Sequence, residues 1–176
     1  LDEILETTDK KFIFAAGHEP AFKLFNSSCL GTYPEERNRF WESLTDAGAK
    51  AYFCGHDHFY DHAIINDRDG NSNNNVHQVI AGTGGSSLFS DSEYNGDNGR
   101  WTPERIFHEK DNGYVLVQVN DSAVKMIWKH RIDQNIYEYG GDSSDFSSSS
   151  TDDISSILES AFLGNYPNPF SSKTVI

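Results

Sequence analysis

The sequence predicts an α/β fold, and three features of its early part support that prediction. Residues 12–16 and 51–54 are short apolar runs of strand length, followed directly by Gly17 and Gly55. Apolar runs without polar alternation are typical of strands that are covered on both faces. A helical pattern lies between the two runs, and this strand–helix–strand order is characteristic of layered α/β proteins.

The predicted helix begins at Pro34, because a missing N–H costs nothing in the first turn of a helix. Glu35 and Glu36 suit the positive amino-terminal end. Apolar residues then recur at helical spacing, at Phe40, Trp41 and Leu44. Gly48 provides a stop for the helix.

From Ile64 onward, the pattern changes to strands and turns. Three further runs predict strands, at residues 76–81, 114–119 and 124–130. Turn-forming residues occupy positions 67–70 and 120–122. The stretch from 82 to 99 is rich in Gly, Ser, Asp and Asn, and therefore predicts a long loop.

We predict three regions along the chain. Residues 1–139 form the globular unit, and residues 140–160 form a flexible linker rich in Ser, Asp and Gly, since such a composition buries too little apolar surface to offset its ordering entropy. In residues 161–176, Pro167 and Pro169 favour an extended or turn conformation.

Composition narrows the possible functions. The 176 residues include 14 Lys and Arg against 27 Asp and Glu, which gives a formal net charge of -13. A surface this negative repels phosphate backbones, which argues against nucleic-acid binding as the main role. No apolar run approaches the ~20 residues needed to cross a bilayer, so we predict no transmembrane segment.

Cys29 and Cys54 are the only cysteines. A secreted protein could join them in a disulfide. However, Cys54 lies in a predicted buried strand, where a free thiol behaves as a small hydrophobic group, so we favour unpaired cysteines.

Three histidines follow directly after the first two predicted strands. His18 stands in Gly-His-Glu-Pro at residues 17–20, and His56 and His58 stand in Gly-His-Asp-His at residues 55–58. Side chains at the carboxyl ends of strands in an open α/β sheet converge on one crevice. Imidazole binds zinc, iron, copper and nickel well. The sequence therefore predicts a metal site formed by these three histidines.

The two histidine motifs resemble the carboxyl-terminal signature blocks of the calcineurin-like metallophosphoesterases. Tyr60 stands two residues after His58, and a tyrosine at this position resembles the purple acid phosphatase branch of the family. The Val-Ile-Ala-Gly-Thr-Gly-Gly run at residues 79–85 resembles the strand and turn that follow the second motif in many members. The resemblance covers residues 12–133. It implies that the chain forms part of a four-layer α/β/β/α sandwich.

The resemblance also implies a chemistry. His18 and His56 would bind one metal ion and His58 the other, the two ions being divalent or trivalent Zn, Fe or Mn. Such ions activate water and neutralise charge during hydrolysis of a phosphate mono- or diester. Tyr60 and His62 are candidates to contact the phosphoester substrate; the alternatives are that Tyr60 simply packs and that His62 lies on a strand face or at the surface. We assign a catalytic role to no side chain of this chain.

The sequence also departs from the family. The amino-terminal blocks Asp-x-His, Gly-Asp and Gly-Asn-His, which supply the bridging Asp, an Asn ligand and a general-acid His, do not occur before residue 12. We therefore expect this chain to be the carboxyl-terminal half of an enzyme domain, inactive alone. The alternatives are a non-catalytic, surface-displayed binding module on the same fold and a single-metal structural histidine site.

Other polar residues have simpler interpretations. Asp57 either orients a metal-bound histidine or is solvated, and Glu19 is interpreted as a solvated loop residue. The glycine-rich residues 82–87 predict a tight turn at the rim of the site, because no Lys-Ser/Thr pair of a phosphate-binding loop follows. The remaining histidines are expected to be structural or exposed: His77, His108 and His130.

The string Asn-Tyr-Pro-Asn-Pro-Phe at residues 165–170 resembles the opening of the carboxyl-terminal sorting domain used by the type IX (Por) secretion system of Bacteroidetes. The resemblance implies a bacterial protein that is secreted or held at the cell surface, with the secretion machinery as a partner. We expect the chain to hold only the start of that domain. The alternative is a proline-rich end with no address function.

Overall fold

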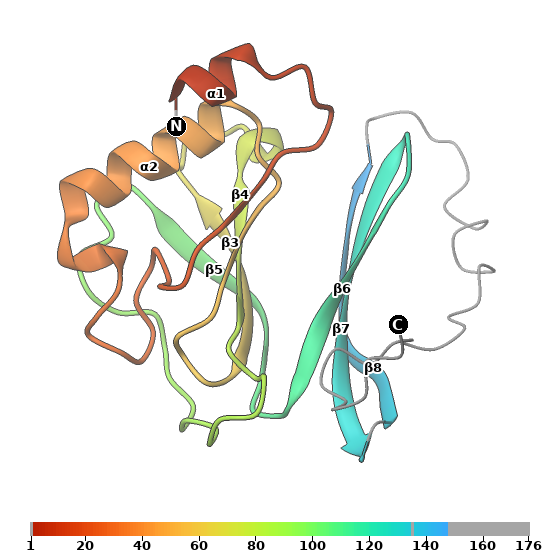
Figure 1. Cartoon of the computed structure of the whole chain (residues 1–176). Coiled ribbons are helices and arrows are strands. Elements are labelled where there is room, and N and C mark those ends of the chain that lie inside the picture. The colour runs from red at the N-terminus through yellow and green to blue at the C-terminus, as the bar shows by residue number, and fades with distance from the viewer. Residues whose placement is uncertain (1, 135, 148–176) are drawn as a thin grey trace.

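The computed structural model describes residues 2–134 and 136–147, which form helices and two β-sheets (Figure 1). The helices are α1 (Asp2–Thr7) and α2 (Pro34–Asp46), with the short 3-10 helices η1 (Leu30–Thr32) and η2 (Ser72–Asn74). One sheet comprises β1 (Phe14–Ala16), β2 (Ala51–Cys54), β3 (Tyr60–Asn66), β4 (Val76–Ala81) and β5 (Thr102–Glu109). The other comprises β6 (Gly113–Val119), β7 (Ala123–Asp133) and β8 (Ile136–Ser147).

The two sheets lie face to face, and the helices cover the outer face of the larger one (Figure 1). The five strands follow the order β1-β2-β4-β3-β5, and the three strands follow the order β6-β7-β8. β1, β2 and β4 are parallel neighbours, whereas β3 pairs antiparallel with β4 and β5. The predicted α/β class is confirmed as this mixed arrangement, and the described residues form a helix layer and two sheet layers.

The predicted elements of the early part agree with the structure. Both apolar runs contain strands, and α2 begins at Pro34 as expected. Gly48 follows the helix with a φ of +67°, a left-handed conformation that glycine adopts without steric cost. Strands also form at the three later positions predicted from the sequence.

β3 and β5 were not predicted, because both carry polar residues. Asp61 on β3 is completely buried, and its carboxylate accepts hydrogen bonds from Tyr94 Oη at 2.6 Å, Arg105 Nε at 2.7 Å and His108 Nδ1 at 2.9 Å. These partners compensate for the cost of burying the charge. The strands therefore form from long-range pairing, which local apolar pattern does not reveal.

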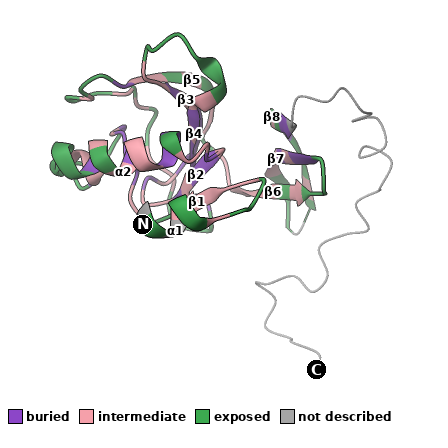
Figure 2. Cartoon of the chain, turned by 90° about the horizontal axis from the view of Figure 1, so that it is seen from above, coloured by how far each residue is buried: buried purple, intermediate pink, exposed green. Residues whose placement is uncertain are grey.

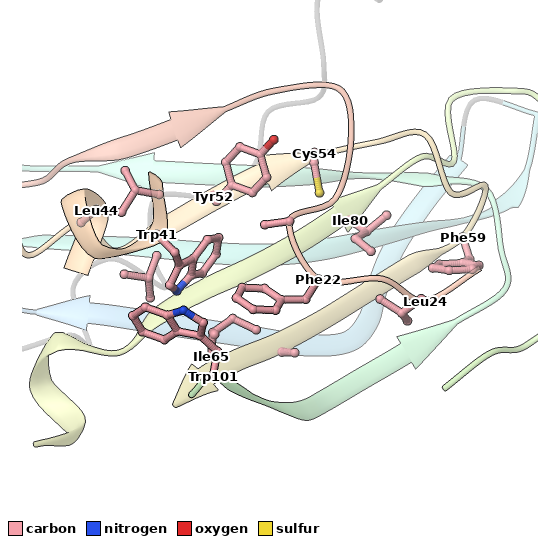
Figure 3. Close-up of a cluster of buried hydrophobic side chains, with 14 residues drawn as sticks. Phe22, Leu24, Trp41, Leu44, Tyr52, Cys54, Phe59, Ile65, Ile80 and Trp101 are labelled. Carbon is pink, nitrogen blue, oxygen red and sulfur yellow. The ribbon is translucent and has the colours of Figure 1, made fainter. Parts of the chain in front are cut away.

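A large apolar core lies between α2 and the five-stranded sheet (Figure 3). Trp41 is completely buried and packs edge-on against Phe22, with ring centroids 4.9 Å apart. Leu44 lies on the same face of α2, and Tyr52 and Ile80 face it from the sheet. This packing holds the strands that carry the histidine motifs.

A second core joins the two sheets, and Figure 2 shows buried segments on β7 and β8 as well as on the larger sheet. Val124, Met126 and Trp128 on β7 are completely buried. Trp128 stacks on Tyr60 of β3, with ring centroids 4.1 Å apart and the planes almost parallel. Aromatic pairs of this kind contribute about 0.5–1.5 kcal/mol beyond their buried area.

A buried polar network crosses the same interface. Asp142 Oδ2 on β8 accepts a hydrogen bond from Tyr60 Oη at 2.5 Å and lies 2.8 Å from His62 Nδ1. His62 Nε2 lies 2.7 Å from His77 Nδ1 on β4. Burial acts to raise the pKa of Asp142, but the hydrogen bond and charge of His62 outweigh it, so the pKa lies below its usual value.

The predicted boundary between the globular unit and the linker lies too early in the chain. β8 continues through residues 140–147, which the sequence analysis placed in a flexible linker. The segment is ordered by pairing with β7, and Gly140 fits because a Cβ there would lie 2.2 Å from Trp128 Cδ1. Residues 148–160 of the predicted linker and all of residues 161–176 lie outside the described residues.

The two cysteines and the helices can be compared with what the sequence predicted. Cys29 and Cys54 are both buried and free, as predicted. Burial raises the pKa of the Cys54 thiol well above its ordinary value, which keeps this group protonated. No helix within residues 2–134 and 136–147 is long and apolar enough to cross a membrane.

Replacing Asp142 with Asn should destabilise the protein by about 3 kcal/mol, because the buried hydrogen-bonded carboxylate joins the two sheets. Asp145→Asn is the matched control, since Asp145 lies on the same strand with its side chain exposed. Urea unfolding of the two variants would measure the difference. Equal stability of both would show that the network contributes nothing.

The stability of the protein should also fall in acid, with His77 as one cause. Burial first, and then the neighbouring His62, lower the pKa of His77 to about 3, from the 6.5 of an ordinary histidine. Because the unfolded chain binds this proton first, the stability present above about pH 6.5 declines as the pH falls towards 3. Asp142 acts in the same direction, since stabilisation by its carboxylate is lost as the pH falls through its lowered pKa.

Urea unfolding of His77→Gln between pH 7 and pH 4 would test this assignment. The variant should lose stability less steeply with acid than the wild-type protein. The same slope for both proteins would remove His77 from the explanation.

Candidate metal centre

Parallel pairing of β1 and β2 places the two histidine motifs side by side. The register aligns Ala16 with Phe53, the residue before the end of β2. Beyond the strands, Gly17 N donates to Phe53 O and Gly55 N donates to His18 O, both at 3.0 Å. The loops that follow the strands are therefore tied together by backbone hydrogen bonds.

Two of the three predicted ligands, His18 and His56, come together at this edge of the sheet. His18 Nε2 and His56 Nδ1 lie 3.1 Å apart. Two nitrogens bound to one tetrahedral zinc ion at about 2.0–2.1 Å would lie roughly 3.3 Å apart. The observed spacing is that of a hydrogen bond between the two rings, and it is also close to the spacing that a shared metal ion requires.

His56 has an unusual backbone. Its φ is +66°, and only one other described non-glycine residue, Arg68, has a positive φ. A side chain in this left-handed region costs about 1–3 kcal/mol, and such residues cluster at functional sites. His56 Nε2 also lies 2.8 Å from Ser28 Oγ, which orients the ring from the opposite side. No sequence pattern had pointed to Ser28.

His58 lies apart from the other two histidines. Its Nδ1 is 3.0 Å from Ser87 O, and its ring stacks on Phe89 with centroids 4.2 Å apart. Within the part of the chain that the structure describes, the three histidines do not bring three ligand atoms within 4.8 Å of one another. The geometry thus gives one close pair and one separate imidazole at the same edge.

The glycine-rich loop at residues 82–87 lies beside the second histidine motif. Ser87 O is 3.0 Å from His58 Nδ1. Gly82 packs against the backbone of the second motif, since a Cβ at Gly82 would lie 2.0 Å from Asp57 O. This close approach explains why a glycine occupies the position.

Asp57 has a role that the sequence did not predict. Its carboxylate is buried and accepts hydrogen bonds from Phe25 N at 3.2 Å and from Asn26 N at 3.1 Å. Asn26 Nδ2 donates to it as well, at 2.6 Å. Asp57 is therefore neither solvated nor bonded to a histidine, and it instead holds the loop that carries Ser28.

Tyr60 and His62 are not brought to the histidine site. Both side chains are completely buried, and both contact Asp142 between the two sheets. The structure therefore places both side chains between the sheets, away from the edge at which the sequence predicted a contact with substrate. Their partner lies 80 or more residues further along the chain, and nothing in the local sequence indicates it.

A second group of potential ligands lies at the end of β5. Glu109, Asp111 and His130 place three ligand atoms within 4.8 Å of one another. His130 Nδ1 is 3.0 Å from Glu109 Oε1, and its Nε2 is 3.3 Å from Glu138 Oε1. The hydrogen bond to Glu109 raises the pKa of His130. A carboxylate therefore lies at each ring nitrogen of His130, and both contacts favour its protonated form.

No family model matches this chain, and no curated protein matches it. Among solved structures, the chain is similar to purple acid phosphatase PPD1 from yellow lupin (Lupinus luteus) seeds, with a TM-score of 0.59 and 19% identity, over 83% of this chain and 27% of that chain. It is also similar to GAP50, the anchor in the inner membrane complex of Plasmodium, with a TM-score of 0.52 and 18% identity, over 72% of this chain and 34% of that chain.

At these identities, the likeness shows the fold alone. The chain spans about a quarter to a third of the length of the structures it matches. Its mixed sheet and its antiparallel sheet together resemble part of a metallophosphoesterase fold.

Gly82→Ala should displace His58, because the added methyl group would overlap the backbone of Asp57. Overpacking of this kind costs about 1–3 kcal/mol. Gly84→Ala is the matched control, since a Cβ at Gly84 meets nothing within 4 Å. NMR chemical shifts of the histidine rings would report the displacement, and identical spectra for both variants would contradict it.

The chain resembles part of a metallophosphoesterase fold, and it brings His18 and His56 together at the edge of its larger sheet.

Proposed function

We propose that this chain forms one side of the active site of a metal-dependent phosphoesterase that hydrolyses phosphate mono- or diesters. His18 and His56 would hold one metal ion, and His58 would hold a second. The observation that carries the proposal is the 3.1 Å separation of the first two ring nitrogens at the ends of adjacent parallel strands. The fold shared with a purple acid phosphatase supports it.

The chain's own residues hold the imidazoles in place. Ser28 faces one ring nitrogen of His56, and Ser87 and Phe89 fix the ring of His58. Bound Zn, Fe or Mn ions would polarise a phosphoryl oxygen and lower the pKa of water. These rings would leave the positive charge of the ions largely uncompensated, because imidazole ligands are neutral. An acidic protein could then attract an anionic phosphoester to this edge.

Full phosphoesterase activity would need metal ligands in addition to His18, His56 and His58. We propose, from the family resemblance, that a bridging carboxylate, an Asn ligand and a general-acid His belong to a further part of the parent protein. The string at residues 165–170 supports the further proposal that this protein is secreted or displayed on a bacterial cell surface, using the type IX secretion machinery.

A binding module without catalytic activity is the second candidate. The similarity to GAP50, which is described as an anchor, favours it, because that fold also occurs in a protein with such a role. The coding sequence upstream of Leu1 separates the two functions. Asp-x-His, Gly-Asp and Gly-Asn-His blocks in frame would support the enzyme, and an upstream sequence without them would support the binding module.

His56→Ala and His58→Ala in the complete protein should each lower phosphoester hydrolysis by more than about 100-fold, since each removes a metal ligand. Both should also lower the bound metal, as measured by mass spectrometry. Hydrolysis of p-nitrophenyl phosphate and its bis ester would measure activity on a monoester and a diester. Arg39→Gln, which changes an exposed side chain on α2 outside both histidine motifs, is the control and should keep both readouts.

Wild-type rates from both variants would remove the histidines from the reaction. Tight, stoichiometric zinc without hydrolysis in the wild-type protein would instead support a structural histidine site.

A further inference from the structure

A buried positive charge near the amino-terminal end of α2 forms no direct ion pair with any described carboxylate. Arg37 is only 2% exposed, and no carboxylate among the described residues lies within 4.0 Å of its guanidinium. Its Nε donates to Asn38 Oδ1 at 3.0 Å, and its Nη2 donates to Asp97 O at 3.1 Å. Its Nη1 makes no hydrogen bond to any residue in the described part of the chain.

Burying the charged guanidinium of Arg37 destabilises the folded state unless other groups compensate for the lost hydration. Buried charges in proteins are normally paired, because removal from water carries a large desolvation cost. Burial lowers the pKa of Arg37, although Asp97 and Cys29 act in the opposite direction. The ring of Phe22 lies 4.9 Å from Arg37 Cζ, and it offers a weak attraction rather than a counter-charge. The guanidinium therefore has one nitrogen, Nη1, without a hydrogen bond in the described part of the chain, and Asp97 is a nearby charge that forms no direct ion pair with it.

The guanidinium lines a cavity of about 230 Å³. Lys23 and Thr32 line the same cavity, and Thr32 lies just before α2 begins at Pro34. The amino-terminal end of a helix carries a partial positive charge and attracts anions. Pockets for drug-sized ligands measure about 300–1,000 Å³, so this smaller cavity suits an ion of a few atoms.

One carboxylate also lines the cavity. Asp97 Oδ1 accepts a hydrogen bond from Gly99 N at 2.9 Å, which engages that oxygen in a local turn. The backbone oxygen of the same residue is the atom that Arg37 contacts. Asp97 therefore helps to orient the guanidinium without forming a direct ion pair with it.

We propose that this cavity binds a tetrahedral oxyanion of the phosphate class, with Arg37 as the principal donor and Lys23 as a second cation. The anion is either free phosphate or a phosphate group on a larger molecule. Guanidinium groups are suited to such oxyanions, because their planar donors bind two oxygens at once. The site lies beside the histidine centre, since Ser27 lines the cavity and Ser28 contacts His56, but the two share no side chain.

Calorimetric titration of the full chain with inorganic phosphate tests the proposal. A chelator is present throughout, so that no metal-bound phosphate contributes. The wild-type chain should bind phosphate at millimolar concentrations or below, and Arg37→Gln should weaken binding at least tenfold. Arg39→Gln removes an exposed positive charge from the same helix and should leave binding unchanged.

Two further variants make the result specific. Lys23→Gln should weaken binding severalfold, and it keeps the proposal testable if Arg37→Gln does not fold. His56→Ala should leave phosphate binding intact, which separates this site from the proposed metal centre. Titration with phosphoserine then distinguishes the two sources, since tighter binding than phosphate indicates a group carried by a larger molecule and weaker binding indicates the free ion.

Three outcomes would overturn the proposal. The first is absence of phosphate binding by the wild-type chain, and the second is equal loss in Arg37→Gln and Arg39→Gln. The third is loss of binding in His56→Ala, which would place the anion at the histidines. None of these outcomes depends on whether the complete protein hydrolyses phosphoesters.

Discussion

The parallel pairing of β1 with β2 is the constraint on which the candidate site depends. Each strand is short, and each ends in a glycine followed by a histidine, so their register alone decides whether the two imidazoles meet. The alignment of Ala16 with Phe53 continues into the loops through backbone hydrogen bonds. Because side chains alternate between the faces of a sheet, a shift of one residue would turn the rings away from each other.

The surrounding structure holds this register from both faces. On one side, Trp41 and its neighbours on α2 pack against the sheet. On the other side, Trp128 and Asp142 bring the smaller sheet against Tyr60. The left-handed backbone at His56 is tolerated within this frame, because a strained residue persists where well-packed surroundings hold it in place.

Local sequence was informative where chemistry and secondary structure coincide. A glycine and a histidine after an apolar strand identified both His18 and His56, and Pro34 located the start of α2. Local sequence did not predict the structure where the burial of a residue depends on a partner far away along the chain. β3 was not predicted, since its buried Asp61 depends on Arg105, which lies 44 positions further along the chain. Residues 140–147 were predicted to be a linker, although they pair with β7. Neither partner is visible in a window of neighbouring residues.

The contact between Tyr60 and Asp142 has a consequence for how the protein is made. The two residues are separated by 82 positions, so the larger sheet emerges from the ribosome long before its inner face can be covered. Contacts between distant segments form late, and until then the nascent chain exposes an apolar face that favours aggregation. Chaperone protection during synthesis would therefore matter most in the interval before the last strand is complete.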